Sequence, residues 1–318
     1  MLRKPRPFSV EAVKDSESKI KSLFPVLHRA YLCMFFLALL AFLLPAGEKM
    51  CYDGNRKDTQ QFSAQDGLFP TLCRFRQNFA LPDLAMRFDL TKQSAGVVCS
   101  TWLERLYLKL CTLSIWPSCQ TIIENMPTDF RLDLPTTLII IDGTELKTEA
   151  PWAHGVQSQL YSDYKSTTTL KGLVGCDPRG SLMFVSELFT GSISDKVSTK
   201  QSGVYETIKK LKEVGCVVDG DAVMADKGFT TRDELKDVGL SLNIPPFATT
   251  GKQMPRADLV LTDKIARHRI HVERLISRIK DFKILSHRIP AHLFPKLNQV
   301  WSVCCYLTLF QGYVLNKE

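Results

Sequence analysis

No two of the ten cysteines stand at the C-x-x-C spacing of a zinc site, and none is spaced with histidine as in a zinc finger. The sequence therefore excludes the common structural zinc modules. Cysteines without a disulfide framework favour a reducing intracellular compartment. Cys73, Cys99 and Cys176 stand in segments of apolar periodicity, so we expect them to be small buried side chains.

An apolar run long enough to span a bilayer is also missing. The uninterrupted run Tyr31–Leu44 has 14 residues, whereas a spanning helix needs about 20. The 30 residues before it hold seven basic and three acidic side chains, an unusual mixture for the start of a signal peptide. The run predicts a buried helix. The alternative is a membrane-associated protein anchored through residues 31–44.

Positive charge is gathered at two places. The formal net charge is +8, and residues 252–288 hold ten Lys or Arg against four Asp or Glu. Residues 1–30 add a further net +4, so the rest of the chain is slightly negative. Such clusters suit a polyphosphate partner, because each phosphate contact releases condensed counterions. DNA is the partner that this pattern favours, and the alternative is a solvated helix face.

A polar stretch separates the apolar run from a helical region. Residues 1–22 are charged and we expect them to be loosely ordered, and residues 48–66 form a linker with a turn signal at 53–54. From 68 to 110 apolar residues recur at intervals of three and four. The first predicted region therefore spans residues 1–66, with helices following it.

Two short breaks, at 80–82 and 89–91, divide the helical region 67–112 into three helices. Pro82 falls in the first turn of the second helix, and Thr91 is the expected N-cap of the third. This is the layout of a helix-turn-helix, and the alternative is an ordinary three-helix bundle.

In a helix-turn-helix the third helix enters the major groove of DNA. Lys92, Gln93 and Ser94 are expected in its exposed first turn, where they would bind phosphates and base edges.

From about residue 135 to 315 the pattern changes to strands alternating with helices, which predicts an α/β domain with a mixed sheet. Residues 137–141 form a continuous apolar run, as expected for a strand buried on both faces. The turn tetrapeptide 177–180 joins the strands of a hairpin. The expected strands are 137–141, 168–176, 181–188, one within 216–225, and 241–244, and the expected helices are 204–214, 232–238, 265–283 and 296–315.

Three acidic residues are candidates for a metal site. Asp142 and Asp226 each come directly after a short apolar run, at the edge of the sheet where open α/β sheets bind ligands. Glu273 stands on the basic helix. Each has a simpler interpretation: the two aspartates could cap turns, and Glu273 could pair with Arg269 or Lys280.

The chemistry of three carboxylates explains the interest of this set. Two carboxylates about 4 Å apart repel by roughly 4 kcal/mol at an effective dielectric near 20, so cations must neutralise them. Hard oxygen ligands select Mg²⁺ or Mn²⁺. Two such ions can activate a water on one side of a phosphodiester and stabilise the leaving 3′-oxygen on the other. The set therefore suggests a nuclease, a phosphodiester hydrolase that needs no nucleophilic side chain.

Six sequence strings, in order, resemble the catalytic domain of PIF/Harbinger-type DDE transposases. The resemblance runs from about residue 138 to 314, and the segment LPDLAMRFDLTKQSAGVVCSTWLERLY before it is similar to the helix-turn-helix of the same family. The strings are LIIIDGTE, SDYKSTTTLKGLVG, GSISDK, VMADKGF, LNIPPF and RHRIHVERLISRIKDFKIL.

The resemblance implies an RNase H-like fold with Asp142, Asp226 and Glu273 as the catalytic, metal-binding triad. It gives Asp195 a structural or substrate-positioning role. It also places three arginines beside Glu273, where they could meet the DNA backbone: Arg267, Arg269 and Arg274.

The implied activity is hydrolysis of DNA at element ends, followed by strand transfer with the freed 3′-hydroxyl. We therefore expect a nuclear endonuclease or transposase that acts on DNA. We also expect it to work with a separate DNA-binding partner protein and to form a homodimer. One alternative is a domesticated DNA-binding or adaptor protein that keeps the fold without cutting. The other is the membrane-anchored protein described above.

Overall fold

The computed structural model describes residues 29–45, 48–52, 62–151, 154–230, 232–247 and 253–311. The predicted loosely ordered segment 1–22 and the predicted turn at 53–54 lie outside these ranges. The chain forms two compact units, and each is described by itself. The predicted division at residues 66, 112 and 135 stays a prediction.

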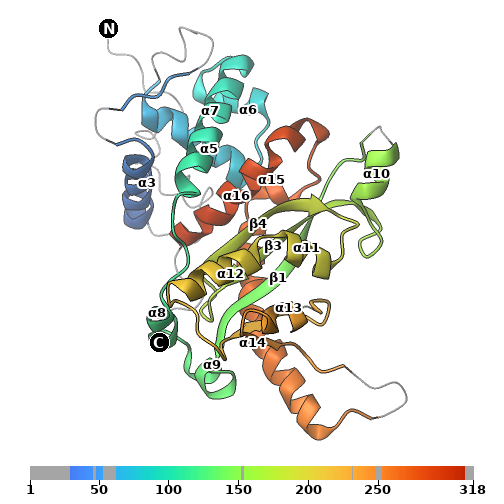
Figure 1. Ribbon diagram of the computed structural model, residues 1–318. Helices are drawn as coiled ribbons and strands as arrows, with labels where there is room; N and C mark the ends of the chain where they lie inside the picture. The colour runs from blue at the N-terminus through green and yellow to red at the C-terminus, as the bar shows by residue number, and fades with distance from the viewer. Residues whose placement is uncertain are drawn as a thin grey trace. The chain divides into compact units, whose positions relative to one another are not determined.

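The first unit is helical (Figure 1). Between residues 64 and 110 it has three helices, as the spacing of apolar residues predicts. Pro82 lies in the first turn of the second helix, and the Oγ1 of Thr91 caps the third by accepting from the backbone N–H of Ser94. The helices of this unit are α3 (Arg29–Leu43), α5 (Ala64–Gln77), α6 (Leu81–Phe88), α7 (Lys92–Leu110), α15 (Lys283–Ser286), α16 (Leu297–Leu307) from residue 299 onward, and the 3-10 helix η2 (Thr308–Gln311).

Helix α3 covers most of the apolar run of the sequence. Leu39 and Leu43 are buried, whereas Leu37 is 45% exposed. The ring of Phe36 meets that of Phe69 edge to face, with centroids 6.2 Å apart. No helix among the described residues is both long and apolar enough to cross a membrane.

The second unit is a mixed α/β domain built on a six-stranded sheet, in the order β2-β3-β1-β5-β6 with β4 also paired to β3. Three strands, β1, β3 and β4, are antiparallel neighbours, and β5 and β6 run parallel to β1. This is the RNase H-like arrangement that was predicted. The strands are β1 (Thr137–Lys147), β2 (Tyr161–Ser162), β3 (Thr167–Cys176), β4 (Leu182–Thr190), β5 (Ala222–Met224) and β6 (Ser241–Asn243).

Helices flank this sheet (Figure 1). The longest, α14, packs against β1 and β3. The helices of the second unit are α8 (Cys119–Glu124), α9 (Thr128–Asp133), α10 (His154–Leu160), α11 (Asp195–Gln201), α12 (Val204–Glu213), α13 (Arg232–Lys236), α14 (Arg256–Lys280) and the 3-10 helix η1 (Ala291–Lys296).

Several predicted boundaries are wrong. The predicted helix 265–283 ends at Lys280, and the predicted helix 296–315 changes at Thr308 to a 3-10 helix. Two further differences have clear physical reasons. Strand β1 does not end at residue 141 but continues to Lys147, because the antiparallel partner β3 pairs with it that far. Helix α14 begins at Arg256 rather than at residue 265. Leu259 and Val260, in its first turns, are about half exposed. These turns therefore lack the apolar periodicity that marks the buried part of the helix.

Two glycines in the helices of the first unit provide a test of its packing. A Cβ at Gly67 would meet the Nε1 of Trp102 and the hydroxyl of Tyr52, which form a hydrogen bond of 2.9 Å. A Cβ at Gly96 would meet only the Cδ1 of Leu81, at an ordinary 3.6 Å.

We expect Gly67→Ala to lower the free energy of unfolding by about 1 to 3 kcal/mol through overpacking. Gly96→Ala is the matched control, and should raise it by about 0.5 to 1 kcal/mol because alanine favours the helix. Urea denaturation of both variants measures the difference. Equal effects of the two substitutions would contradict this packing.

Candidate active site

Two acidic side chains lie at the same level of the parallel pair β1–β5. The last pair between β1 and β5 joins Ile140 to Met224. Asp142 and Asp226 each follow that pair by two residues. Asp226 therefore lies just past the end of β5, whereas Asp142 lies within β1, paired with Val174 of β3, and not after the strand as predicted. Their shared register brings the two carboxylates together where β5 ends.

Arg269, on α14, lies between the two carboxylates. Its Nη1 is 3.1 Å from the Oδ1 of Asp226, and its Nη2 is 3.5 Å from the Oδ2 of Asp142. The arginine side chain is only 14% exposed, and its buried Nε has no hydrogen-bond partner in the part of the chain that the structure describes. One guanidinium thus supplies the positive charge that two neighbouring carboxylates require.

Glu273 lies one helical turn after Arg269 on α14 and is exposed. Its negative charge, like that of Asp226, raises the pKa of Asp142, so the three acids act on one another electrostatically. Within the described ranges, however, no three His, Cys, Asp or Glu side chains are already grouped as metal ligands. The guanidinium of Arg269 pairs with both aspartates in this arrangement.

Comparison with known proteins assigns the family. A family model described as DDE superfamily endonuclease matches residues 141–308, more than half of the chain. The chain belongs to this family. No curated protein sequence matches it.

A cryo-EM structure of the piggyBac transposase synaptic complex with hairpin DNA is similar to this chain, with 11% sequence identity and a TM-score of 0.34. The similarity covers 89% of this chain and 66% of the piggyBac chain, so the chain spans slightly less than two thirds of that transposase.

The donor atoms of the site suit a hard divalent cation. Carboxylate oxygens are the ligands that Mg²⁺ and Mn²⁺ prefer. Asp142 is largely shielded from solvent, with its side chain 18% exposed, whereas the side chain of Asp226 is 51% exposed. The guanidinium already bridging the pair shows that this edge of the sheet attracts positive charge. The residues present therefore fit the metal that the DDE family implies.

The environment of Asp142 disfavours its ionised form. Burial is the largest influence and raises its pKa to about 6, helped by the charges of Asp226 and Glu273. Arg269 and the backbone N–H of Gly143, which donates to Oδ1 at 2.9 Å, act in the opposite direction. Burial thus outweighs the guanidinium, and Asp142 needs more positive charge than Arg269 supplies.

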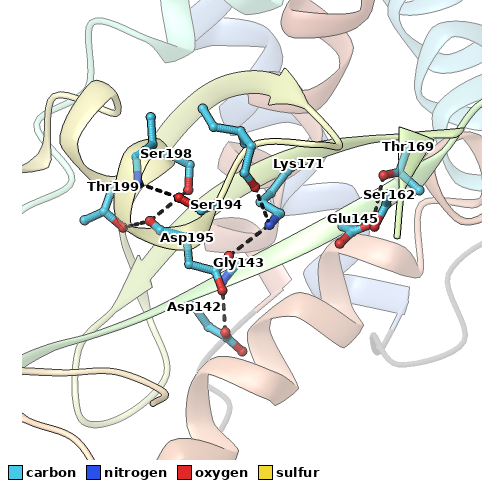
Figure 2. Close-up of polar contacts among 12 residues, drawn as sticks. Asp142, Gly143, Glu145, Ser162, Thr169, Lys171, Ser194, Asp195, Ser198 and Thr199 are labelled. Carbon is cyan, nitrogen blue, oxygen red and sulfur yellow. Dashed lines mark hydrogen bonds and ion pairs between the residues drawn. The ribbon is translucent and has the colours of Figure 1, made fainter. Parts of the chain in front are cut away.

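Asp195 lies beside this site. It is the first residue of α11, and its Oδ1 accepts a hydrogen bond of 3.0 Å from the Nζ of Lys171 on β3 (Figure 2). The same carboxylate approaches the backbone of Gly143, next to Asp142. Lys171 stands in the string SDYKSTTTLKGLVG, so the family resemblance included it but assigned it no role.

The other predicted arginines of α14 are placed differently from Arg269. Arg267 pairs with Asp263 at 2.7 Å and lies 4.0 Å from Asp133, and its side chain is 59% exposed. Arg274, the residue after Glu273, is exposed. Of the three predicted arginines, Arg269 is the one that contacts the two aspartates in the described part of the chain.

Lys280 is a residue of the site that the sequence pattern indicates only as a partner for Glu273. It lies two turns beyond Glu273, and burial lowers its pKa. Glu145 and Asp142 act in the opposite direction, so its ammonium group lies within electrostatic range of the site. Its spacing of eleven residues from Arg269, close to three turns, would have placed it on the same helix face.

The predicted DNA-contacting turn of α7 is partly corrected. Lys92 and Gln93 are exposed, as expected. Ser94 is wrong as an exposed residue, because it is fully buried: it is the third residue of the helix, and its Oγ accepts a hydrogen bond from the capping hydroxyl of Thr91 at 2.9 Å.

Asp142→Asn tests the electrostatic penalty in metal-free protein. The folded pKa of about 6 lies above the ordinary unfolded value, so folding favours the protonated form. The contribution of Asp142 to the free energy of unfolding is therefore fully present below about pH 4 and is lost as the pH rises through about 6. Asparagine stays neutral and keeps an oxygen for the N–H of Gly143.

We expect Asp142→Asn to raise the free energy of unfolding by about 2 to 3 kcal/mol at pH 8 in EDTA, with the gain vanishing near pH 4. Urea denaturation across this range measures it. Exposed Asp163→Asn is the control and should change little. A variant destabilised at pH 8 would contradict the assignment.

Proposed function

We propose that this chain is a metal-dependent DNA endonuclease or transposase of the PIF/Harbinger type, which hydrolyses phosphodiester bonds. The observation that carries the proposal is the meeting of Asp142, within β1, and Asp226, just past the end of β5, on the single guanidinium of Arg269. Two aspartates paired with one cation at the carboxyl end of a parallel strand suit metal-assisted hydrolysis.

In this proposal Asp142, Asp226 and Glu273 would hold Mg²⁺ or Mn²⁺, and the metal would supply an activated water and stabilisation of the leaving 3′-oxygen. The protein side chains would hold the cations, and Arg269 partly neutralises the two aspartates when cations are absent. Burial of Asp142 strengthens its attraction to cations, because the ionised carboxylate is poorly solvated.

The distribution of charge supports DNA as the substrate. Residues 252–288 carry a net charge of +6, and most of them belong to α14, which also carries Glu273. Arg274 is exposed next to Glu273 and could contact the backbone of DNA. Exposed Lys92 and Gln93 at the start of α7 are candidates for a second contact, in a helix-turn-helix spanning residues 67–112.

The wider setting follows from the family resemblance. We propose that the protein acts in the nucleus, joins the freed 3′-hydroxyl to target DNA, and works as a homodimer with a separate DNA-binding partner protein. Recovery of the protein in carbonate-resistant membranes would instead support an anchor through residues 31–44.

Cleavage of supercoiled DNA in Mn²⁺ tests the proposal. We expect nicking by the wild-type protein and a loss of roughly a hundredfold or more in Asp226→Ala and in Glu273→Gln, since metal stabilisation of a phosphoryl transition state contributes several kcal/mol. Gel analysis of nicked and linear products gives the rates.

Asp263→Ala is the matched control, because Asp263 is an exposed acid of the same helix that pairs with Arg267. Equal nicking by wild type and Asp226→Ala would remove the proposed site. Salt-dependent DNA binding without nicking, unchanged in Glu273→Gln, would favour the domesticated adaptor.

Arg269→Gln tests whether the guanidinium and the metal compete. Removing a cation that contacts Asp142 and Asp226 should tighten Mn²⁺ binding about tenfold, measured by the free Mn²⁺ signal in electron paramagnetic resonance. Arg267→Gln removes an arginine that pairs with Asp263 instead and should leave Mn²⁺ binding unchanged. Weaker binding in Arg269→Gln would show that the arginine supports the metal rather than replacing it.

A further inference from the structure

The Lys171–Asp195 ion pair stands beside the proposed site without belonging to the triad. Lys171 lies on β3 with its side chain 13% exposed. Its Nζ donates to the Oδ1 of Asp195 at 3.0 Å and to the carbonyl of Ile193 at 2.9 Å (Figure 2). A largely buried ammonium with two acceptors is a fixed contact rather than a solvated surface charge.

The carboxylate of Asp195 lies close to the backbone beside both proposed catalytic aspartates, at Gly143 and at Gly228. A Cβ added at Gly228, two residues after Asp226, would lie 2.7 Å from its Oδ2. A Cβ added at Gly143, next to Asp142, would lie 3.7 Å from its Oδ1. One carboxylate therefore packs against the backbone on either side of the proposed metal site.

Close approach explains the glycine at position 228. The described glycines with positive φ do not include Gly228, so its backbone conformation is open to other residues. The space beside it is taken by the Oδ2 of Asp195. A side chain at this position would have to displace either that carboxylate or the turn that follows Asp226.

Asp195 is itself held in place. Its backbone carbonyl accepts hydrogen bonds from the hydroxyls of Ser198 at 3.0 Å and Thr199 at 2.7 Å, and both residues are buried. The hydroxyl of Ser194 caps α11 by accepting from the N–H of Val197 at 3.3 Å. With Lys171 on its side chain and these bonds on its backbone, Asp195 has little freedom to withdraw.

We propose that the Lys171–Asp195 pair is a positioning element that sets the separation of Asp142 and Asp226 for metal binding. The pair links β3 and α11 to the backbone beside Asp142 and Asp226. We assign Asp195 as a positioning residue, because its Oδ1 accepts from Lys171 and its Oδ2 packs against the backbone at Gly228. This inference rests on the proposed function, since it concerns the geometry of the same site.

A double-substitution cycle on Mn²⁺ affinity, measured by paramagnetic resonance without DNA, tests the pair. Gly228→Ala should weaken Mn²⁺ binding about tenfold by pushing the Asp226 turn away from Asp195. Asp195→Ala should also weaken Mn²⁺ binding, because the backbone at Gly143 and Gly228 loses the carboxylate that packs against it. The two effects should not add: Gly228→Ala should cost little further affinity once Asp195 is alanine, since the clash is gone.

Conservative substitutions separate positioning from general stability. Lys171→Arg, which keeps the charge, should retain Mn²⁺ affinity better than Lys171→Met, at matched thermal stability. Gly155→Ala is the control, because a Cβ there meets nothing within 4 Å.

The outcomes are distinct. Unchanged Mn²⁺ affinity in Gly228→Ala and Lys171→Met, with wild type binding Mn²⁺ and nicking DNA, would overturn this inference alone. Strictly additive losses in the cycle would also overturn it. A wild-type protein that binds no Mn²⁺ would overturn the proposed function and this inference together.

Discussion

Repulsion between two carboxylates held together where β5 ends dominates the site. Asp142 and Asp226 stand two residues past the same β1–β5 pair, so the sheet forces them toward each other whatever their charge. Ionised together, they require a cation. In this structure Arg269 supplies it with two nitrogen atoms of one guanidinium. Because burial still holds the pKa of Asp142 near 6, this single charge leaves the site short of positive charge.

The rest of the domain holds Asp142 and Asp226 in these positions. Strand β1 is anchored on one side by eight register pairs with β3 and on the other by its parallel pairing with β5. Helix α14 packs on β1 and β3 and carries Arg269 and Glu273 one turn apart. Sites that hold like charges together reduce the stability of the fold, and proteins retain them where function requires it. Membership of the DDE superfamily endonucleases is the functional context in which such a site makes sense.

Local patterns in the sequence predicted much of this arrangement. Apolar runs that end in Asp142 and Asp226, a turn tetrapeptide at 177–180 and the capping residue Thr91 are all signals confined to a few neighbouring residues. What the sequence could not predict depends on distant partners. Strand β1 continues to Lys147 because β3 pairs with it, and Lys171 finds its acceptor 24 residues away in Asp195. Ser94 turned out buried because the cap and the helix packing, not its polarity, decide its position.

A crystal structure of the protein soaked with Mn²⁺, with the metal located by anomalous scattering, would show whether the two aspartates hold the cation. We expect an anomalous peak within coordination distance of Asp142 and Asp226, with Glu273 turned toward it and the guanidinium of Arg269 displaced from both aspartates. A structure at saturating Mn²⁺ in which Arg269 still bridges the two carboxylates, and the metal lies elsewhere or nowhere, would contradict it.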